Sequence, residues 1–200
     1  MDTLFDKITT ALVVIDLQKG ITAIPAAPYE AKTVILNAAK LAEAFRRCHM
    51  PVFLVRVSSS PDGKDRLTPI TDNLGTWAQN TVSADWSEIV PELISKNDEP
   101  IITKKQWGAF YGTDLDLQLR RRKIETIVLC GISTNIGVES TARCAYEYGF
   151  QQIFVEDAMS ARSSTEHNNT IETIFPRIGR VRKTQDILAI LAENEHKYDS

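Results

Sequence analysis

The sequence predicts a three-layer α/β domain, and three observations support this fold class. Short apolar runs rich in β-branched residues alternate along the chain with longer segments of helical periodicity. These runs lack the polar alternation of a half-exposed sheet, so we expect both faces of each strand to be covered. The chain has 200 residues, the length of one ordinary domain, and we expect residues 1–200 to form a single domain.

Of the six strand candidates, all but the one at 52–57 are followed by a helical segment. They read ALVVI at 11–15, VFLVRV at 52–57, IIT at 101–103, TIVLC at 126–130 and IFV at 153–155, with a weaker sixth, IGRV, at 178–181. Helices are expected at 31–47, 115–122, 135–148, 167–175 and 185–191. Such alternation implies right-handed crossovers and a parallel sheet with helices on both faces.

Composition and charge exclude several classes of protein. The net charge of -3 gives no reason to expect a nucleic-acid-binding surface. No apolar stretch approaches the ~20 residues that are needed to span a membrane. The three cysteines, Cys48, Cys130 and Cys144, show no paired spacing, which is typical of a reduced chain. Asp2 and Asp6 make the first residues unlike a signal peptide. We therefore expect a cytoplasmic protein that binds neither membranes nor nucleic acids.

One segment, 58–99, interrupts the alternation. It contains several prolines and glycines and two tryptophans, Trp77 and Trp86. A long irregular stretch in a compact domain is usually a functional loop or lid. A surface excursion that packs its tryptophans on the domain accounts for it equally well, and an oligomer contact is a third use.

Three residues are expected at one edge of the sheet. Asp16 ends the first strand, Lys104 follows the third, and Gly131 ends the fourth. Ligands of such sheets bind beyond the carboxyl ends of the strands. A cap or turn role for Asp16 and a solvated Lys104 are the structural alternatives. If the two lie close, the lysine favours the charged carboxylate while burial opposes it, and the sequence leaves open which effect is larger.

The turn that follows the fourth strand leads into the helix expected from Asn135. Unpaired N–H groups at a helix start can stabilise an oxyanion, although an ordinary turn capped by Thr134 is an alternative. Gly137 stands in the first helical turn, where glycine costs up to ~1 kcal/mol against alanine. Space for a ligand or water would explain it, and close packing against a neighbouring strand is the other explanation.

The remaining candidates are aromatic residues and histidines. Trp107, Phe110 and Tyr111 could line a pocket for a flat or cyclic ligand, although core packing explains Phe110 equally well. We expect His167 to be exposed or to cap a helix. The histidines have no partners at metal-ligand spacing, so neither a metal nor another cofactor is expected.

Three separated segments resemble the motifs of one family, the isochorismatase-like hydrolases. They are Val13-Val14-Ile15-Asp16-Leu17-Gln18, Lys104-Lys105-Gln106-Trp107-Gly108-Ala109-Phe110, and the 127–143 segment around Gly131-Ile132-Ser133-Thr134. Their order matches the family, and the spacing within the second selects Lys104 over Lys105. Gly137 stands where the family usually has its catalytic cysteine. Cys130 is expected in the core, and neither Cys48 nor Cys144 is placed to substitute.

The resemblance implies further features. The six strands should have the order 3-2-1-4-5-6, and the chain should form a homo-oligomer. Backbone donors are implied at Ser133 and Gly137, with a cis bond between Ile132 and Ser133. The metal cluster of the nicotinamidase branch is absent, because the region after the second strand reads Arg56-Val57-Ser58-Ser59-Ser60. Gln18, Trp107, Phe110 and Ile132 are expected to contact the substrate.

Two functional hypotheses follow. In the first, the chain is a hydrolase without a cysteine nucleophile, in which Asp16 is the general acid and base and Lys104 assists it. Its substrate would be a small carboxylated or cyclic molecule. The second is a non-catalytic ligand-binding or scaffold homologue that lost the nucleophile. An amidase that uses water directly is weaker, because an amide is a hard target without a thiolate.

Overall fold

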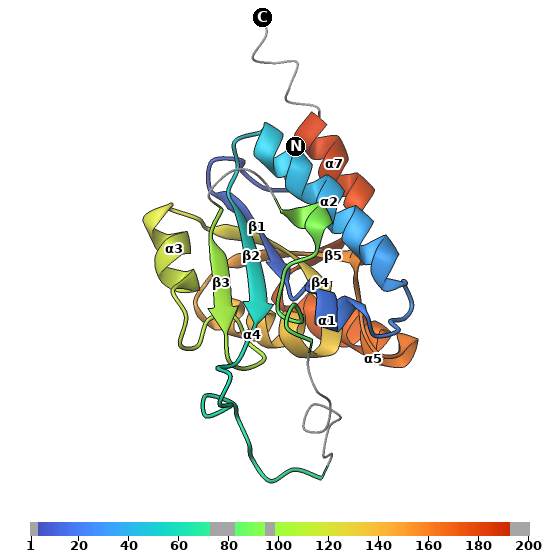
Figure 1. The fold of residues 1–200 in the computed structure, drawn as a ribbon. Coiled ribbons are helices and arrows are strands. Elements are labelled where there is room, and N and C mark those ends of the chain that lie inside the picture. The colour runs from blue at the N-terminus through green and yellow to red at the C-terminus, as the bar shows by residue number, and fades with distance from the viewer. Residues whose placement is uncertain (1–3, 73–82, 95–98, 193–200) are drawn as a thin grey trace, which may run out of the picture.

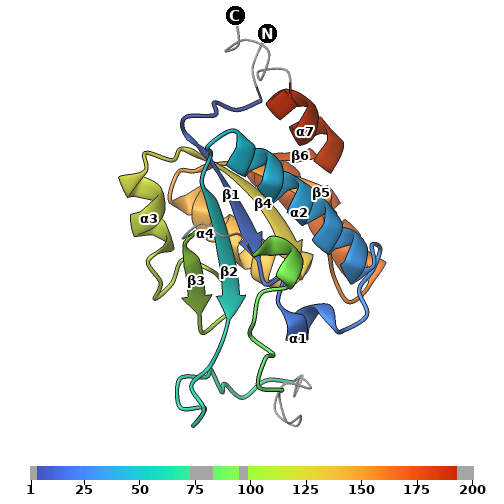
Figure 2. The same cartoon turned by 45° about the horizontal axis from the view of Figure 1, so that its top comes forward.

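The computed structural model describes residues 4–72, 83–94 and 99–192, and these contain one six-stranded parallel sheet. Its strand order is β3-β2-β1-β4-β5-β6, as expected (Figures 1 and 2). The strands are β1 (Thr10–Ile15), β2 (Val52–Val57), β3 (Ile101–Lys104), β4 (Thr126–Ile132), β5 (Gln151–Ser160) and β6 (Arg180–Arg182). The weaker sixth candidate is thus a real strand, shifted toward the C-terminus.

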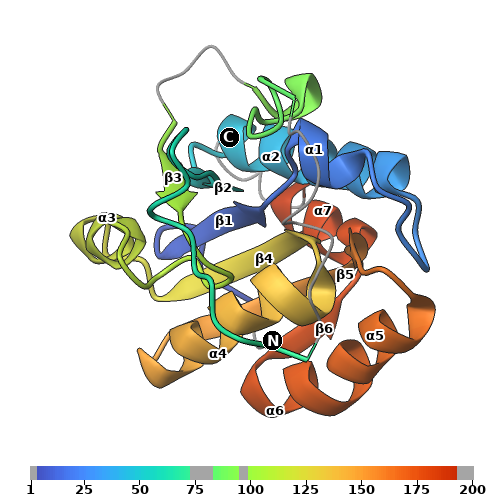
Figure 3. The ribbon, with the colours of Figure 1, turned by 60° about the horizontal axis from the view of Figure 1, so that its bottom comes forward.

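Helices cover both faces of this sheet, which gives the three expected layers (Figure 3). One face carries α2 (Ala31–Arg47), α7 (Thr184–Ala192) and the short 3₁₀ helix η2 (Pro91–Leu93). The other face carries α3 (Leu115–Arg121), α4 (Glu139–Glu147) and α6 (Phe175–Ile178). None of the helices in the described residues is long and apolar enough to cross a membrane.

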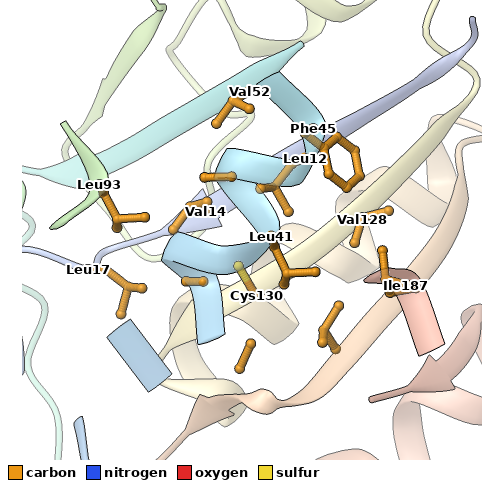
Figure 4. Close-up of a cluster of buried hydrophobic side chains, with 14 of the residues drawn as sticks. Leu12, Val14, Leu17, Leu41, Phe45, Val52, Leu93, Val128, Cys130 and Ile187 are labelled. Carbon is orange, nitrogen blue, oxygen red and sulfur yellow. The ribbon is translucent and has the colours of Figure 1, made fainter. Parts of the chain in front are cut away.

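The two cores follow from the alternation of side chains along each strand. In β1, Leu12 and Val14 pack toward α2, where Leu41 and Phe45 are fully buried (Figure 4). Their neighbours in β1 belong to the opposite cluster, under α3 and α4. Because both faces are covered, the central strands β1 and β4 are buried along their whole length, and this explains their uninterrupted apolar runs in the sequence.

Some elements differ from the expected ones. The helix expected at 135–148 begins as a π-helical turn, η3 (Thr134–Val138), before α4. The helix expected at 167–175 is three pieces: α5 (Ser164–Asn169), the π-helical η4 (Thr170–Ile174) and α6. The four-residue helix α1 (Lys19–Thr22) was not expected. β5 is longer than expected because its pairing with β4 shifts register between Leu129 and Gly131.

The carboxyl ends of the strands lie together at one rim of the sheet, at the bottom of Figure 1. The 58–72 stretch leaves β2 at this rim, and α1 follows β1 there (Figure 2). Gly131 in β4 pairs with Ile15 in β1, and a Cβ on Gly131 would lie 2.0 Å from the Ile15 carbonyl oxygen. Only glycine therefore lets β4 pass β1 at this point.

Candidate active site

Asp16 and Lys104 form a buried ion pair at this rim. Lys104 is the last residue of β3, and Asp16 directly follows β1, so the pair reaches across β2, which lies between them. The Lys104 Nζ lies 2.7 Å from the Asp16 Oδ2, and the two side chains are 1% and 6% exposed. The Asp16 N–H donates to the carbonyl of Val55 in β2, which fixes its backbone with φ 53°. The prediction that these two residues lie together at one edge of the sheet is therefore confirmed.

The environment of Asp16 perturbs its acidity. Burial is the largest effect and raises the pKa of Asp16 from 3.8 to about 6, although the Lys104 charge and hydrogen bond act in the opposite direction. The Asp16 Oδ1 is buried and has no hydrogen-bond partner among the described residues. One carboxylate oxygen is thus held by the lysine, while the other has no hydrogen-bond donor among the described residues.

Gly137 packs directly against this ion pair. A Cβ added to Gly137 would lie 2.9 Å from the Asp16 Oδ2 and 3.2 Å from the Lys104 Nζ. Both distances are shorter than ordinary van der Waals contacts of a Cβ. Of the two explanations for this glycine, close packing is the one that fits, and the packing partner is the ion pair together with Ile15.

The turn that carries Gly137 has the form that the resemblance implied. The peptide bond between Ile132 and Ser133 is cis. The Ser133 carbonyl accepts the N–H groups of Ile136, at 3.2 Å, and Val138, at 3.1 Å. These bonds close the π-helical turn η3 and bring Gly137 against Asp16. Asp16, Lys104 and Gly137 therefore converge from β1, β3 and the turn after β4.

The two neighbouring lysines have different surroundings. Lys104 also donates a hydrogen bond to the Trp107 carbonyl, which leaves its ammonium fully enclosed by protein groups. Lys105 instead pairs with Asp65 at 2.7 Å on the surface, where its side chain is 42% exposed. The spacing argument that selected Lys104 as the site residue is consistent with this burial.

The three aromatic residues that could line a pocket have different surroundings, and Tyr111 is 80% exposed. The Trp107 side chain is 65% exposed, so it borders solvent. Phe110 belongs to the core under α3 and α4, where it contacts the rings of Tyr148 and Phe150. For Phe110 the core alternative therefore describes its position.

Gln18 and Ile132 also have structural contacts. Gln18 is fully buried, and its amide bonds the N–H and carbonyl of Val57, at 2.8 and 3.0 Å, and the carbonyl of Trp86. Its donors and acceptor thus link the end of β1 to the end of β2. Ile132 is buried in the core cluster beneath α2. Their role toward a substrate stays a prediction.

His167 is the residue whose position was predicted wrongly. It is buried rather than exposed or capping, because Ser163 caps α5 instead. Its Nδ1 lies 2.8 Å from the hydroxyl of Thr134, and burial lowers its pKa to about 4. No short-range signal reveals this contact, because the partner is 33 residues away.

Part of the 58–99 segment packs on the domain. The N–H groups of Lys19 and Gly20 donate to the carbonyls of Glu88 and Trp86, and Leu93 is fully buried in the core. A Cβ on Gly20 would lie 1.9 Å from the Trp86 ring, so this tryptophan is seated on α1. For residues 83–94, the alternative that the segment packs on the domain is therefore correct. Trp77 lies outside the described residues.

Other groups capable of covalent or metal chemistry are not assembled here. Cys130 is buried in the core, and burial raises the pKa of its thiol, while Cys48 and Cys144 are half-buried and free. Across 4–72, 83–94 and 99–192, no three His, Cys, Asp or Glu side chains gather as metal ligands.

Comparison with known proteins places this architecture in a family. The family model of the isochorismatase domain matches residues 10–186. The chain is 52% identical over 189 residues to the uncharacterized isochorismatase family protein YwoC of Bacillus subtilis, covering 94% of this chain and 97% of that protein. It is 30% identical over 169 residues to Nicotinamidase 3 of Arabidopsis thaliana, with coverages of 80% and 78%.

A solved structure has the same fold. An isochorismatase family protein from Burkholderia thailandensis superposes with a TM-score of 0.87 at 44% identity, over 92% of this chain and 96% of that one. The strand order, the motifs at the rim and these matches agree, and the chain therefore belongs to the isochorismatase-like hydrolase family.

Proposed function

We propose that this protein hydrolyses a small carboxylated or cyclic molecule without a covalent enzyme intermediate. The observation that carries the proposal is the enclosed Asp16–Lys104 pair, whose carboxyl has its pKa raised to about 6. A group that titrates near neutral pH can both give and take a proton during a reaction. Relatives named as hydrolases of small molecules, such as Nicotinamidase 3, support the substrate size.

Asp16 acts as the general acid and then as the general base in this proposal. Its protonated form donates a proton to the substrate, and a water molecule attacks the electron-poor centre that results. The water loses a proton, which returns to Asp16 and restores the enzyme. The hydroxylated adduct then breaks its bond to the leaving group, and the proton of the new hydroxyl leaves with that group, which completes the hydrolysis. Oδ1 is the atom for this transfer, because Oδ2 is held by the Lys104 ammonium.

Lys104 and the turn after β4 assist. The Lys104 ammonium keeps the carboxyl oriented and limits the rise in the Asp16 pKa that burial causes. The backbone N–H groups of Ser133 and Gly137 are the proposed donors to a developing negative charge. Gly137 supplies no nucleophile, and its lack of a side chain allows Asp16 and Lys104 to approach the turn.

The test is turnover of a panel of small vinyl ethers, esters and amides, each with a carboxylate or a ring. Asp16→Asn should lower the turnover of any substrate found by about 10²–10⁴-fold, because the amide is nearly isosteric but cannot transfer a proton in this range. Asp65→Asn is the matched control, since it removes the aspartate of the neighbouring exposed pair. Thermal melting verifies that both variants fold. Undiminished turnover by a stable Asp16→Asn protein would remove Asp16 from the mechanism.

The near-complete burial of the pair favours one other function, that of a non-catalytic ligand-binding homologue. An enclosed ion pair can orient a bound ligand without transferring a proton. The same panel separates the two, because a binding protein would show ligand-dependent shifts in melting temperature and no turnover by the wild type.

A further inference from the structure

The described residues contain two π-helical segments, η3 and η4. Two side-chain contacts connect the chain around η3 to the chain around η4. The Thr134 hydroxyl, at the start of η3, lies 2.8 Å from Nδ1 of His167, in the helix α5 that leads into η4. One helical turn farther along, the Thr170 hydroxyl donates to Glu139 Oε2 at 2.6 Å, at the start of α4. Two side-chain contacts thus connect α5 and η4 to the turn after β4 and to the start of α4.

The contact between Thr134 and His167 is buried. Thr134 is completely buried and His167 is 3% exposed. The ring of Tyr29 packs edge-on against the histidine, with the centroids 5.9 Å apart. The Ser160 hydroxyl accepts the Tyr29 N–H and donates to the Tyr29 carbonyl, which fixes the backbone of Tyr29. A neutral imidazole satisfies the hydroxyl in either tautomer, as acceptor or as donor. In a buried setting, a lost partner leaves a polar group unsatisfied.

Thr134 lies between the cis peptide bond and Gly137, so its orientation affects the whole turn. The Ser133 carbonyl just before it accepts the two N–H groups that close η3. Gly137, three residues later, contacts Asp16. We propose that His167 is a positioning residue, which fixes the backbone of the Ser133–Gly137 turn through the hydroxyl of Thr134. Its consequence for catalysis rests on the proposed function, whereas its effect on the turn does not.

A double-mutant cycle with a local readout tests this proposal. Thr134→Val keeps the shape but removes the hydroxyl, and His167→Phe keeps a ring but removes Nδ1. Each variant should lower the melting temperature and shift the backbone amide resonances of 133–138 in ¹H–¹⁵N spectra. The double variant should melt no lower than the less stable single variant and show the same shifts, because one bond is lost in all three. Additive losses of melting temperature, or unchanged amide resonances, would overturn the proposal.

Two further variants separate positioning from general packing. Thr134→Ser retains the hydroxyl and should restore the wild-type amide positions even if His167→Phe folds poorly. Thr170→Val removes the neighbouring bond to Glu139 and should lower the melting temperature without moving the Ser133 and Gly137 amides. If Thr170→Val moves them as much as Thr134→Val does, the turn is held by helix packing as a whole, and His167 has no special part.

The catalytic consequence is measured on a substrate found by the panel above. Thr134→Val should lower kcat about tenfold or more with KM little changed, since misplaced donors act mainly on the transition state. Thr134→Ser should recover most of the rate. If the wild type turns over nothing, the proposed function fails, while the amide resonances still decide whether His167 positions the turn. If turnover exists and Thr134→Val leaves it unchanged despite shifted amides, His167 does not position catalytic groups.

Discussion

Lys104 and Lys105 are consecutive residues, and each ammonium lies 2.7 Å from an aspartate oxygen. In the buried pair, the pKa of Asp16 is raised to about 6, whereas in the exposed pair the Lys105 hydrogen bond lowers that of Asp65 to about 2. The distance is the same, so the loss of hydration decides the direction. Ion pairing alone therefore does not raise the pKa of a carboxyl toward neutral pH, whereas burial of the ion pair does.

Removing each lysine should separate the two pairs most clearly. Lys104→Met leaves a buried carboxylate without its partner, and we expect a loss of about 3–5 kcal/mol in the free energy of unfolding at pH 8. The loss should shrink at pH 5, because Asp16 then becomes protonated. Urea unfolding at both pH values measures this, with Lys105→Met as the control that should change little. Equal losses from the two variants would mean that burial does not distinguish the pairs.

The pH dependence of stability should differ between the pairs in sign. The folded-state pKa of Asp16 is raised from 3.8 to about 6, so its contribution to stability falls by about 3 kcal/mol as pH rises through this window. The pKa of His167 is lowered from 6.5 to about 4, so its contribution rises by about as much from pH 4 to 6.5. The two contributions therefore have opposite signs in this pH range. The pKa of Asp65 is lowered, so its contribution is lost only below pH 3.8.

Single variants should reveal the pH dependence of stability that each of the two buried groups contributes. Denaturant unfolding of Asp16→Asn between pH 4 and 6.5 should show stability that rises with pH, because the shift of His167 is no longer opposed by that of Asp16. His167→Phe should show stability that falls with pH over the same range. Parallel curves for the two variants would contradict the pKa directions of both groups.

Crowding the buried pair should have a smaller effect. Gly137→Ala would place a Cβ 2.9 Å from the Asp16 Oδ2, so the ion pair or the turn must move, at a cost of about 1–3 kcal/mol. Gly108→Ala is the matched control, because its Cβ would come no closer than 3.6 Å to Ser140. Thermal melts compare the two, and a Gly137→Ala protein as stable as the wild type would show that the pair has room to separate.

The smallest effect is expected for the exposed pair. Asp65→Asn should leave the melting temperature nearly unchanged, because solvated ion pairs contribute little. Any difference from the wild type should vanish in about 1 M NaCl, where the Debye length is ~3 Å. A clear destabilisation that persists in high salt would indicate that Asp65 acts through its hydrogen bonds to Ser60 rather than through Lys105.

The strands and the main site residues could be predicted because their signals are local. An apolar run such as 126–130 indicates a strand that is covered on both faces. The residue that ends each parallel strand must lie at the edge of the sheet where the carboxyl ends of the strands meet. The family resemblance added the strand order and the cis bond after Ile132, which composition and periodicity do not contain.

The residues that were placed wrongly or incompletely depend on distant contacts. His167 meets Thr134, and the amide of Gln18 meets Val57 in the next strand. The π-helical turns η3 and η4 likewise differ from the regular helices that the apolar pattern predicted. The periodicity of residues close in sequence carries no information on contacts between residues that are far apart in the chain.

The sequence alone shows which chemical groups stand at the ends of two strands, a carboxyl at Asp16 and an ammonium at Lys104. It also shows that Gly137, in the segment after the fourth strand, has no side chain beyond Cα. It left open whether the lysine charge or burial controls the carboxyl. Only the tertiary structure decided this, because the cost of desolvation depends on how completely β1, β3 and the turn after β4 exclude water together. With Asp16 enclosed and Gly137 against it, burial has the larger effect, and the pKa rises.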